Sequence, residues 1–400
     1  MRTDLTIPEA VAALVAALPT LKLENVPLLE ASNRVLAADL SSLVDHPNTN
    51  DSALDGYAVQ LEETLSATPK TPVRLRLVGE VAAGAKAFGQ SLESGQAVKV
   101  FTGGAVPLGA TGIAMVEHTT RDGDFVLLHQ PAVPEIRLKG QDLETGTIYL
   151  PKGTRLNGSS LALAAAMGYA TLPVLERPKI AILSTGDEII EPGQPLPEGA
   201  VYNANSYGLA AELLEMGAEP ILLPKVPDDL ENTKSAILAA GAAHLVLTIG
   251  GVSMGERDFV RKLLETQGTI DFWRIRVKPG GPPILGHLQG IPVFGLPGNP
   301  VSSLVVFDVV VKAALFIQLG ILEPAYETVR AKASSAFKSA GAKQGLWRAN
   351  LTWTGEHYSV SAFSNQSSQV LRSLVQSNAL AIVPPDEARA IGDWLEVIRL

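Results

Sequence analysis

The segment from Pro178 to Ile321 restricts the fold most, because short apolar runs alternate there with helical patterns. The strand patterns KIAIL, PILLP and HLVLTI are each followed by a loop and a helix, and WRIRV is followed by a loop and the hairpin ILGHLQGIPVF. This alternation is typical of a mostly parallel sheet with helices on both faces. We therefore predict an α/β domain over residues 177–322, ending in a long helix from Val301.

Unusual loops follow the strands of this segment, and they read STGDE, VPDD, TIGGVSMGERD, KPGGP and LPGNP. Ligands of open α/β sheets bind outside the carboxyl ends of the strands, so we expect these loops to form one functional rim. Carboxylate oxygens on such a rim suit Mg²⁺ when phosphate oxygens and water complete its ligands. Each acid alone is better explained as an N-cap or turn residue, whereas together they favour a site: Asp187, Glu188, Asp228, Asp229 and Asp258.

The loop TIGGVSMGERD has a pattern typical of ligand binding. It places Gly250, Gly251 and Ser253 between a strand and the start of a helix. Glycines let the backbone approach a ligand, and the first N–H groups of a helix can bind an anion, so the loop predicts a phosphate-binding turn. It is neither a P-loop nor a GxGxxG turn, and glycines in such turns also serve packing alone.

Positive charge precedes the KPGGP loop. Arg274, Arg276 and Lys278 alternate with apolar residues, so on one strand they would share a face. That face is either a solvated edge or a row of charge leading to the rim, and the position of Lys278 at the strand end favours the second for that residue. In LPGNP, Pro297 and Pro300 fix the backbone at a helix entry. No serine, histidine and aspartate arrangement accompanies these loops, which favours metal-assisted handling of a phosphate ester or anhydride.

Composition excludes several classes of function. The chain has no cysteine, hence neither disulfides nor thiolate metal sites, and its net charge of −9 argues against nucleic acid as a partner. Asp4 and Pro8 interrupt the Ala-rich N-terminus, and Thr6 with Glu9 makes a capping box, which predicts an amphipathic helix instead of a signal peptide. The apolar stretch from Val301 contains charges, so we expect a buried helix and a cytoplasmic protein without a membrane span.

Two further regions are predicted to be rich in β-strands. Short apolar runs separated by Gly, Pro and Asp clusters span residues 73–128, and a similar pattern spans 323–400. The first of these regions could be inserted between two halves of a domain that begins at the N-terminal helix.

Three polar residues outside the α/β segment are noteworthy. Asp55 and Gly56 lie between strand patterns and are best explained locally as a hairpin turn. Thr102 is the only hydroxyl residue of a second glycine loop, FTGGAVP, and Asp142 belongs to a charged cluster in EIRLKGQDL.

These patterns together resemble the molybdopterin molybdenumtransferases, the family of bacterial MoeA and the E domain of gephyrin. The resemblance runs from about residue 6 to the C-terminus. It rests on motifs that occur in a fixed order: SALDGYAV, FTGGAVP, IRLKGQD, STGDEI, NANS, TIGGVSMGERD, KPGGP, GLPGNPVSS and QSSQVLRSLVQSNALAIVP. Each motif alone is a weak indication, whereas the whole series is highly specific.

The resemblance implies a protomer of four parts. Residues 1–44 with 138–176 would form an elongated helical domain, 45–137 an inserted β-domain, 177–322 an α/β domain of the molybdopterin-binding type, and 323–400 a C-terminal β-domain. Two protomers would form a head-to-tail homodimer, with each active site between the α/β domain of one subunit and parts of its partner.

The implied reaction takes adenylylated molybdopterin and molybdate as substrates. It cleaves the phosphoanhydride with Mg²⁺, releases AMP and leaves molybdenum on the dithiolene. Further implied partners are the adenylyltransferase that supplies the adenylate and other cofactor-assembly proteins.

Position within the motifs assigns a role to each site residue. The resemblance implies catalytic roles for Asp55, Asp142, Glu188, Asp228, Asp258 and Lys278, of which Glu188, Asp228 and Asp258 would bind the metal. It implies substrate-binding roles for Thr102, Asp187, Gly250, Gly251, Ser253, Arg274, Pro297 and Pro300. Asp55, Thr102 and Asp142 would reach the site from the other subunit, an interpretation that competes with the hairpin turn at Asp55.

The chain departs from many relatives at KPGGP, where they carry KPGKP. Gly281 replaces the second lysine, so the anion pocket has either lost a charge or uses Arg276 instead. On this basis we expect weak affinity for molybdate, which Gly281→Lys should raise.

Two other functions remain open at the level of the sequence. An adenylyltransferase is one, since the domain that adenylylates molybdopterin resembles the same α/β unit. A non-catalytic scaffold that binds pterin or peptide is the other. The first would consume ATP, the insertase would release AMP from the preformed adenylate, and the scaffold would do neither.

Overall fold

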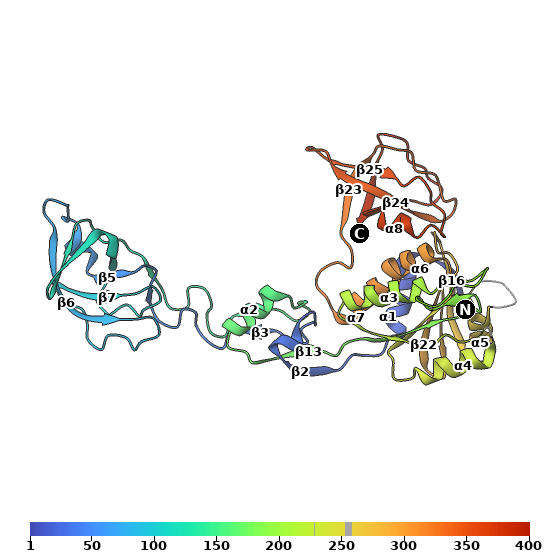
Figure 1. Ribbon diagram of the computed structural model, residues 1–400, viewed down its shortest axis with the longest axis horizontal. Helices are drawn as coiled ribbons and strands as arrows, with labels where there is room; N and C mark the ends of the chain where they lie inside the picture. The colour runs from blue at the N-terminus through green and yellow to red at the C-terminus, as the bar shows by residue number, and fades with distance from the viewer. Residues whose placement is uncertain (228, 253–257) are drawn as a thin grey trace.

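The computed structural model describes residues 1–227, 229–252 and 258–400. The molecule is elongated, with an α/β module and a C-terminal β-module at one end and a second β-module at the other (Figure 1). A slender central module, made of two separate chain segments, connects the two ends. The predicted combination of a mostly parallel α/β domain with an inserted β-domain and a C-terminal β-domain is confirmed.

The α/β module is built on a seven-stranded sheet. Both faces of this sheet are buried. Successive residues of one strand point to opposite faces, so Ile180 packs in the core on one side and Ala181 in the core on the other. All neighbouring strands are parallel except β21, which is antiparallel to β19 and β22. The strand order is β1 (Arg2–Leu5), β19 (Thr269–Ile275), β21 (Ile284–Leu288), β22 (Ile291–Leu296), β18 (Leu245–Ile249), β14 (Lys179–Ser184) and β17 (Glu219–Leu222).

Helices cover both faces of this sheet. One face carries α1 (Ile7–Ala17), α3 (Ala204–Glu215) and a long helix composed of α6 (Pro300–Val306), a π-helical stretch (Phe307–Lys312) and α7 (Ala313–Leu319). The other face carries α4 (Leu230–Ala239) and α5 (Phe259–Gln267). The long helix is apolar enough to cross a membrane, but 67% of its apolar window is buried within the protein. It is therefore the buried core helix that the sequence predicted.

The N-terminal residues correct one of the predicted boundaries. Residues 1–44 were expected in the elongated domain, but β1 extends the α/β sheet by pairing with β19, with Leu5 opposite Ile275. The predicted capping box is present at Thr6 and Glu9, and α1 buries Leu14 completely in the core of the α/β module. This pairing joins segments from opposite ends of the chain, which no local pattern indicates.

The central module has a small core of its own. Two short antiparallel pairs build it, β2 (Leu23–Pro27) with β13 (Thr171–Leu175) and β3 (Leu40–Ser41) with β12 (Ile148–Leu150). The helix α2 (Gly158–Ala166) closes it and ends before Gly168, whose φ is 98°. In each pair, one strand precedes the inserted β-module in the sequence and the other follows it. The central module is therefore held together by pairing between these two chain segments.

The inserted β-module contains a six-stranded sheet. Its order is β8 (Gly112–Met115), β5 (Gly56–Val59), β7 (Gln96–Val100), β6 (Val73–Val81), β10 (Phe125–Leu128) and β9 (Thr119–Asp122). The short pair β4 (Asp51–Ser52) with β11 (Ile136–Arg137) lies where the chain enters and leaves, and Arg137 binds Asp51 through two hydrogen bonds of 2.8 and 3.1 Å.

The hairpin turn predicted at Asp55 and Gly56 is wrong. Gly56 is the first residue of β5, which pairs with β7 and β8 and not with the preceding β4. A Cβ on Gly56 would lie 2.1 Å from the carbonyl oxygen of Ala114, so the glycine serves close packing between strands.

The C-terminal module is a small barrel. Its strands are β24 (Gln344–Trp353), β25 (Tyr358–Ala362), β23 (Thr328–Ala333), β27 (Trp394–Arg399) and β26 (Ala379–Val383), and a second pairing of β26 with β24 closes the ring. The short helix α8 (Arg372–Val375) accompanies them. A strand of the α/β segment, β20 (Val277–Lys278), is added beside β24, which ties the barrel to the functional rim.

Candidate functional site

A cleft of about 920 Å³ lies at the carboxyl ends of β14, β18 and β22. The loops that follow these strands form its walls, together with residues 201–205 ahead of and within α3. Pro282 of the KPGGP loop and Gln369 of the C-terminal module complete it. The strands that lead here are parallel, so their loops meet at one edge, as expected for a doubly covered sheet.

Gly250 and Gly251 line this cleft directly after β18. Both have positive φ, 87° and 67°, a conformation that favours glycine. A Cβ on Gly251 would also lie only 3.1 Å from Cγ2 of Val260 on α5. The N–H of Gly250 donates to the carbonyl oxygen of Leu296 at 2.9 Å, which ties the loop to β22. The remaining predicted member of this turn, Ser253, lies outside the described residues.

Glu188 is exposed and lines the cleft from the loop after β14. Its carboxylate lies over Gly186, where a Cβ would approach Oε2 to 2.7 Å, and Gly186 has a φ of 134°. The neighbouring Asp187 is exposed and does not belong to the cleft lining. The ammonium group of Lys225 donates to the carbonyl oxygens of Asp187 at 3.1 Å and of Ile189 at 2.7 Å, and so holds this loop against the one after β17.

The two acids at helix starts have different environments. Asp229 caps α4 by accepting from the N–H of Asn232 at 2.8 Å, and hydrogen bonds from Asn232 lower the pKa of Asp229. Asp258 occupies the same position before α5, but its carboxylate does not cap that helix, and it lines the cleft. The capping explanation therefore holds for Asp229 and not for Asp258. Asp228 lies outside the described residues.

The described carboxylates of the cleft suit a magnesium ion shared with a substrate. Glu188 and Asp258 both line the cleft, and the described part of the chain contains no group of three side chains that could enclose a metal. Mg²⁺ is usually held by one or two carboxylates, with substrate phosphate oxygens and water as the other ligands. The donor set therefore fits this ion in the presence of a phosphate and not as a permanent structural centre.

The expected row of positive charge on one strand is interrupted. Arg274 has a φ of 74°, which breaks the regular alternation, and its guanidinium lies 4.7 Å from the centre of the Trp273 ring. After Ile275 the chain leaves the seven-stranded sheet, and Lys278 lies on β20 beside the C-terminal barrel. Arg274, Arg276 and Lys278 thus do not share a strand face, because the strand changes sheets between them.

The KPGGP loop folds back onto the end of β19. The N–H of Ile275 donates to the carbonyl oxygen of Gly281 at 3.1 Å, and the N–H of Arg274 donates to that of Pro283 at 2.8 Å. Gly280 has a φ of 107°, and a Cβ there would approach Cγ2 of Val306 to 2.3 Å. These contacts hold the loop between the cleft and the long helix.

Pro297 and Pro300 both line the cleft. Pro300 is the first residue of α6, where its missing N–H costs no helical hydrogen bond. Between the two prolines, the carbonyl oxygen of Gly298 accepts from Nδ2 of Asn205 at 2.8 Å. The NANS segment therefore fixes the LPGNP loop from the side of α3.

The remaining predicted residues lie far from this cleft within one chain. Asp55 and Thr102 belong to the inserted β-module at the other end of the molecule, and Asp142 lies near its junction with the central module (Figure 1). The carboxylate of Asp55 accepts from the N–H of Thr102 at 2.7 Å and from its hydroxyl at 2.8 Å, and these bonds lower the pKa of Asp55. Asp142 is exposed, and its N–H donates to the carbonyl oxygen of His46 at 3.0 Å.

Sequence reasoning missed several residues of the cleft. Asn205 and Gln369 lie within motifs quoted for the family resemblance, but nothing in their local pattern suggests ligand contact. Pro282 follows the glycines of KPGGP, and its local pattern indicates only a turn.

Arg348 of β24 is another residue that the sequence did not single out. Its side chain is fully buried, donates from Nε to Oγ of Ser373 at 3.2 Å and from Nη2 to the carbonyl oxygen of Ser367 at 3.1 Å. Burial lowers the pKa of Arg348 to about 10. Within the described atoms its Nη1 has no hydrogen-bond partner.

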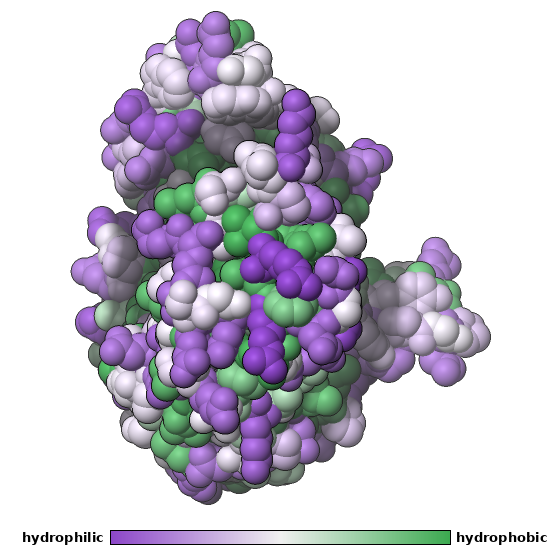
Figure 2. Space-filling model, turned by 90° about the vertical axis from the view of Figure 1, so that its left-hand side faces the viewer, coloured by the Kyte–Doolittle hydropathy of each residue, from purple (hydrophilic) through white to green (hydrophobic). Residues whose placement is uncertain are grey.

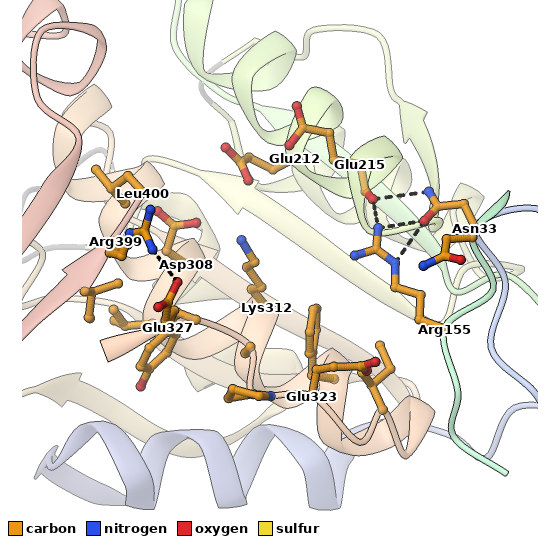
Figure 3. Close-up of a pocket in the computed structure, with 18 of the residues that line it drawn as sticks. Asn33, Arg155, Glu212, Glu215, Asp308, Lys312, Glu323, Glu327, Arg399 and Leu400 are labelled. Atoms are coloured by element: carbon orange, nitrogen blue, oxygen red, sulfur yellow. Dashed lines mark hydrogen bonds and ion pairs between the residues drawn. The ribbon is translucent and has the colours of Figure 1, made fainter. Parts of the chain in front are cut away.

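A second cavity, of about 730 Å³, lies beside the long helix (Figure 3). Asp308 and Lys312 of the π-helical stretch, Glu212 of α3 and the C-terminal residues Arg399 and Leu400 line it. Burial, and then the charge of Glu212, raises the pKa of Asp308 to about 7. This cavity contains none of the predicted site residues.

Models of three families match successive parts of the chain. The MoeA N-terminal region matches residues 5–168, the probable molybdopterin binding domain matches 181–316 and the MoeA C-terminal region matches 330–400. The match of the N-terminal region begins at Leu5, before α1.

Several curated proteins are similar over nearly the whole chain. A molybdopterin molybdenumtransferase 2 of Mycobacterium tuberculosis is 36% identical over 386 residues, which is 93% of this chain and 94% of that protein. A molybdopterin molybdenumtransferase of Synechococcus elongatus is 37% identical over 391 residues, 94% of each chain. The crystal structure of the molybdopterin biosynthesis MoeA protein from Pyrococcus horikoshii superimposes with a TM-score of 0.82 at 29% identity, covering 99% of this chain and 100% of that one.

Proposed function

The chain belongs to the molybdopterin molybdenumtransferase family, and from this premise we propose that it inserts molybdenum from molybdate into adenylylated molybdopterin and releases AMP. The observation that carries the proposal is the cleft at Gly250 and Gly251. A ligand can approach the backbone of these glycines closely, and two carboxylates, Glu188 and Asp258, line the same cleft. A phosphoanhydride needs both features, because its phosphates require close donors and its cleavage requires charge neutralisation.

The described residues divide the work of this reaction. The backbone of Gly250 and Gly251 would hold a phosphate of the adenylate, and Pro297 and Pro300 would shape the adjoining wall. Lys278, on the strand that joins the α/β module to the barrel, would bind the oxyanion. Positioning and charge compensation then supply the rate enhancement, since the described cleft contains no serine, histidine and aspartate arrangement.

Glu188 and Asp258 would hold Mg²⁺, and Asp228 is assigned with them from its place in the motif. Bound there with the phosphates, the ion would neutralise charge on the phosphoanhydride as it breaks. Asp258 is assigned to this role because it lines the cleft together with Glu188, Gly250 and Gly251.

The remaining assigned residues require a second subunit. Asp55, Thr102 and Asp142 lie at the far end of the protomer from the cleft, so a head-to-tail homodimer is the arrangement that would complete the site (Figure 1). Exposed leucines on the central and β-modules, Leu29, Leu43 and Leu138 among them, suit burial by another chain. Hydrophobic side chains also reach the surface between hydrophilic ones on the end of the molecule shown in Figure 2. We place this reaction in the cytoplasm.

A nucleotide assay tests the proposal against the adenylyltransferase alternative. Purified protein is incubated with Mg²⁺ and either adenylylated molybdopterin plus molybdate or ATP plus molybdopterin, and nucleotides are separated by chromatography. We expect AMP from the adenylate and no consumption of ATP. Consumption of ATP would assign the chain to adenylyl transfer, and binding of the adenylate without cleavage would assign it to non-catalytic scaffolding.

A further inference from the structure

Gly281 leaves a space that a lysine from the C-terminal barrel occupies. The ammonium nitrogen of Lys343 lies 3.2 Å from the position that a Cβ on Gly281 would take. The carbonyl oxygens of Val277 and Ile275 lie 3.6 and 3.8 Å from the same position. A side chain at residue 281 would therefore compete with the Lys343 ammonium group for this space.

Backbone pairing fixes the approach of Lys343. β20 runs parallel to β24, with Val277 opposite Gln344 and Lys278 opposite Gly345. The N–H of Gln344 donates to the carbonyl oxygen of Arg276 at 2.9 Å. Lys343 directly precedes Gln344, so the register that joins the barrel to the α/β segment also sets its place beside the KPGGP loop.

The cations around this loop have no paired carboxylate among the ion pairs of the described residues. The ammonium nitrogen of Lys278 lies 5.7 Å from the centre of the Trp347 ring, and both Lys278 and Lys343 are exposed. Lys278 pairs with Gly345, two residues after Lys343, so both lysines lie at the same junction of loop and barrel, where their positive charge favours an anion.

Arg276 lies next to the N-terminal strand and the start of α1. Its N–H donates to the carbonyl oxygen of Leu5 at 2.7 Å, in register with the N-terminal strand. Hydrogen bonds from Thr6, followed by the charges of Arg276 and Arg2, lower the pKa of Glu9. The charge of Arg276 therefore acts on the start of α1, whereas Lys343 is the cation that lies beside the Cβ position of Gly281.

We propose that Lys343 is a specificity-determining residue that binds the tetrahedral oxyanion substrate together with Lys278 at the KPGGP loop. The inference rests on the proposed function, under which that oxyanion is molybdate. Pro282, the residue after Gly281, lines the cleft, so an anion held here would lie next to the adenylate site. The C-terminal module thus contributes two residues: Gln369, which lines the cleft, and Lys343, which supplies a positive charge for the substrate.

The same geometry revises the effect expected for Gly281→Lys. In the wild-type chain the Cβ of the new lysine would lie 3.2 Å from the Lys343 ammonium group and displace it, so we now expect weaker binding of molybdate and not tighter binding. In the Lys343→Ala background the space is free, and a lysine at residue 281 would restore the charge.

The test is equilibrium dialysis of the full chain against molybdate, for the wild type, Lys343→Gln, Lys343→Arg, Lys343→Ala, Gly281→Lys, and Gly281→Lys combined with Lys343→Ala. Lys338→Gln, an exposed lysine of the same module, is the matched control. We expect Lys343→Gln to raise the Kd for molybdate about tenfold, since a charge-assisted contact is lost. Lys343→Arg and the combined variant should bind within about threefold of the wild type, and Lys338→Gln should bind as the wild type does.

A Kd unchanged by Lys343→Gln would overturn the inference, as would a combined variant that binds no better than Lys343→Ala. AMP release from the adenylate, measured on the same proteins, separates this inference from the proposed function. Molybdate binding that depends on Lys343 without any AMP release would support the anion site and contradict the insertase. AMP release together with molybdate binding that does not depend on Lys343 would support the insertase and contradict the anion site at Lys343.

Discussion

At the scale of single residues, two aspartates with the same sequence context differ in the structure. Asp229 and Asp258 both precede a helix, but only Asp229 caps its helix, while Asp258 lines the cleft. A sequence pattern contains the helix start and the acid in both cases. It does not contain the neighbouring loops, which decide which carboxylate caps its helix and which one lines the cleft.

Asp258→Asn should fold and lose AMP release by at least about 100-fold, because under the proposed function it removes a charge that would hold Mg²⁺ at the phosphoanhydride, and such a loss costs several kcal/mol of transition-state stabilisation. The measurement is the rate of AMP release at saturating Mg²⁺, with circular dichroism as the check on folding. Glu265→Gln on the same helix, at an exposed carboxylate paired with Arg261, is the control and should keep the wild-type rate. Retention of full activity in Asp258→Asn would remove this residue from the site.

At the scale of elements, the KPGGP loop depends on glycine for a steric reason. Gly280 has a φ of 107° and no room for a Cβ beside Val306, whereas Gly290, in the hairpin between β21 and β22, has a φ of 85° and open space around it. The sequence places both glycines in turns. Only the packing of Gly280 against the long helix shows that Gly280 has no room for a side chain, whereas Gly290 has.

Gly280→Ala should therefore destabilise more than Gly290→Ala. Both substitutions force alanine into a left-handed conformation, at a cost of about 1 kcal/mol, and Gly280→Ala adds about 1–3 kcal/mol for the clash with Val306. Urea unfolding of the two variants measures the difference. Equal midpoints would mean that the long helix yields to the added methyl group without cost.

The π-helical stretch of the long helix carries a second element-scale effect. Burial, aided by Glu212, raises the pKa of Asp308 to about 7, while Lys312 acts in the opposite direction. The folded state then retains a proton that the unfolded state releases, so Asp308 should cost stability as pH rises from about 4 to about 7, by up to about 4 kcal/mol. Figure 3 shows these three side chains around the same cavity.

Asp308→Asn should accordingly flatten the dependence of stability on pH. It should raise the melting temperature at pH 8 and change it only slightly at pH 4, where the folded aspartate is protonated and the unfolded one is only about half ionised. Thermal unfolding monitored by circular dichroism measures this, with Glu323→Gln, an exposed carboxylate of the same cavity, as the control. A gain at pH 4 as large as that at pH 8 would show that packing, and not ionisation, is responsible.

At the scale of the whole molecule, the separation of the assigned residues is the main structural fact. The cleft lies in the α/β module, and Asp55 with its partner Thr102 lies at the other end of an elongated protomer (Figure 1). A homodimer that pairs opposite ends would bring them together, and it would make each site depend on both chains.

A mixing experiment tests this dependence. Asp55→Ala and Asp258→Asn homodimers should each be inactive, because each lacks one group in both of its sites. After the two proteins are mixed, unfolded and refolded together, about a quarter of the wild-type activity should return, since half of the dimers would carry one intact site. A mixture as inactive as its components would place all catalytic groups in one chain.

The sequence predicted the layers of the fold because each depends on local periodicity. The strands and helices from β14 to α7, the capping box at Thr6 and the two β-rich regions all have that basis. It could not predict the pairing of β1 with β19, the change of sheet after Ile275 or the approach of Lys343 to Gly281. Each of these joins segments that are far apart in the chain, and their pairing follows from the assembled cores.

The most direct test of the central claim combines AMP release with reconstitution of an apo-molybdoenzyme. Purified protein receives adenylylated molybdopterin, Mg²⁺ and molybdate, and both the released AMP and the activity of the reconstituted molybdoenzyme are measured. We expect AMP release to require molybdate and to match the amount of active molybdoenzyme. AMP release without an active product, or an active product formed equally well without this protein, would contradict the assignment of molybdenum insertion to the cleft.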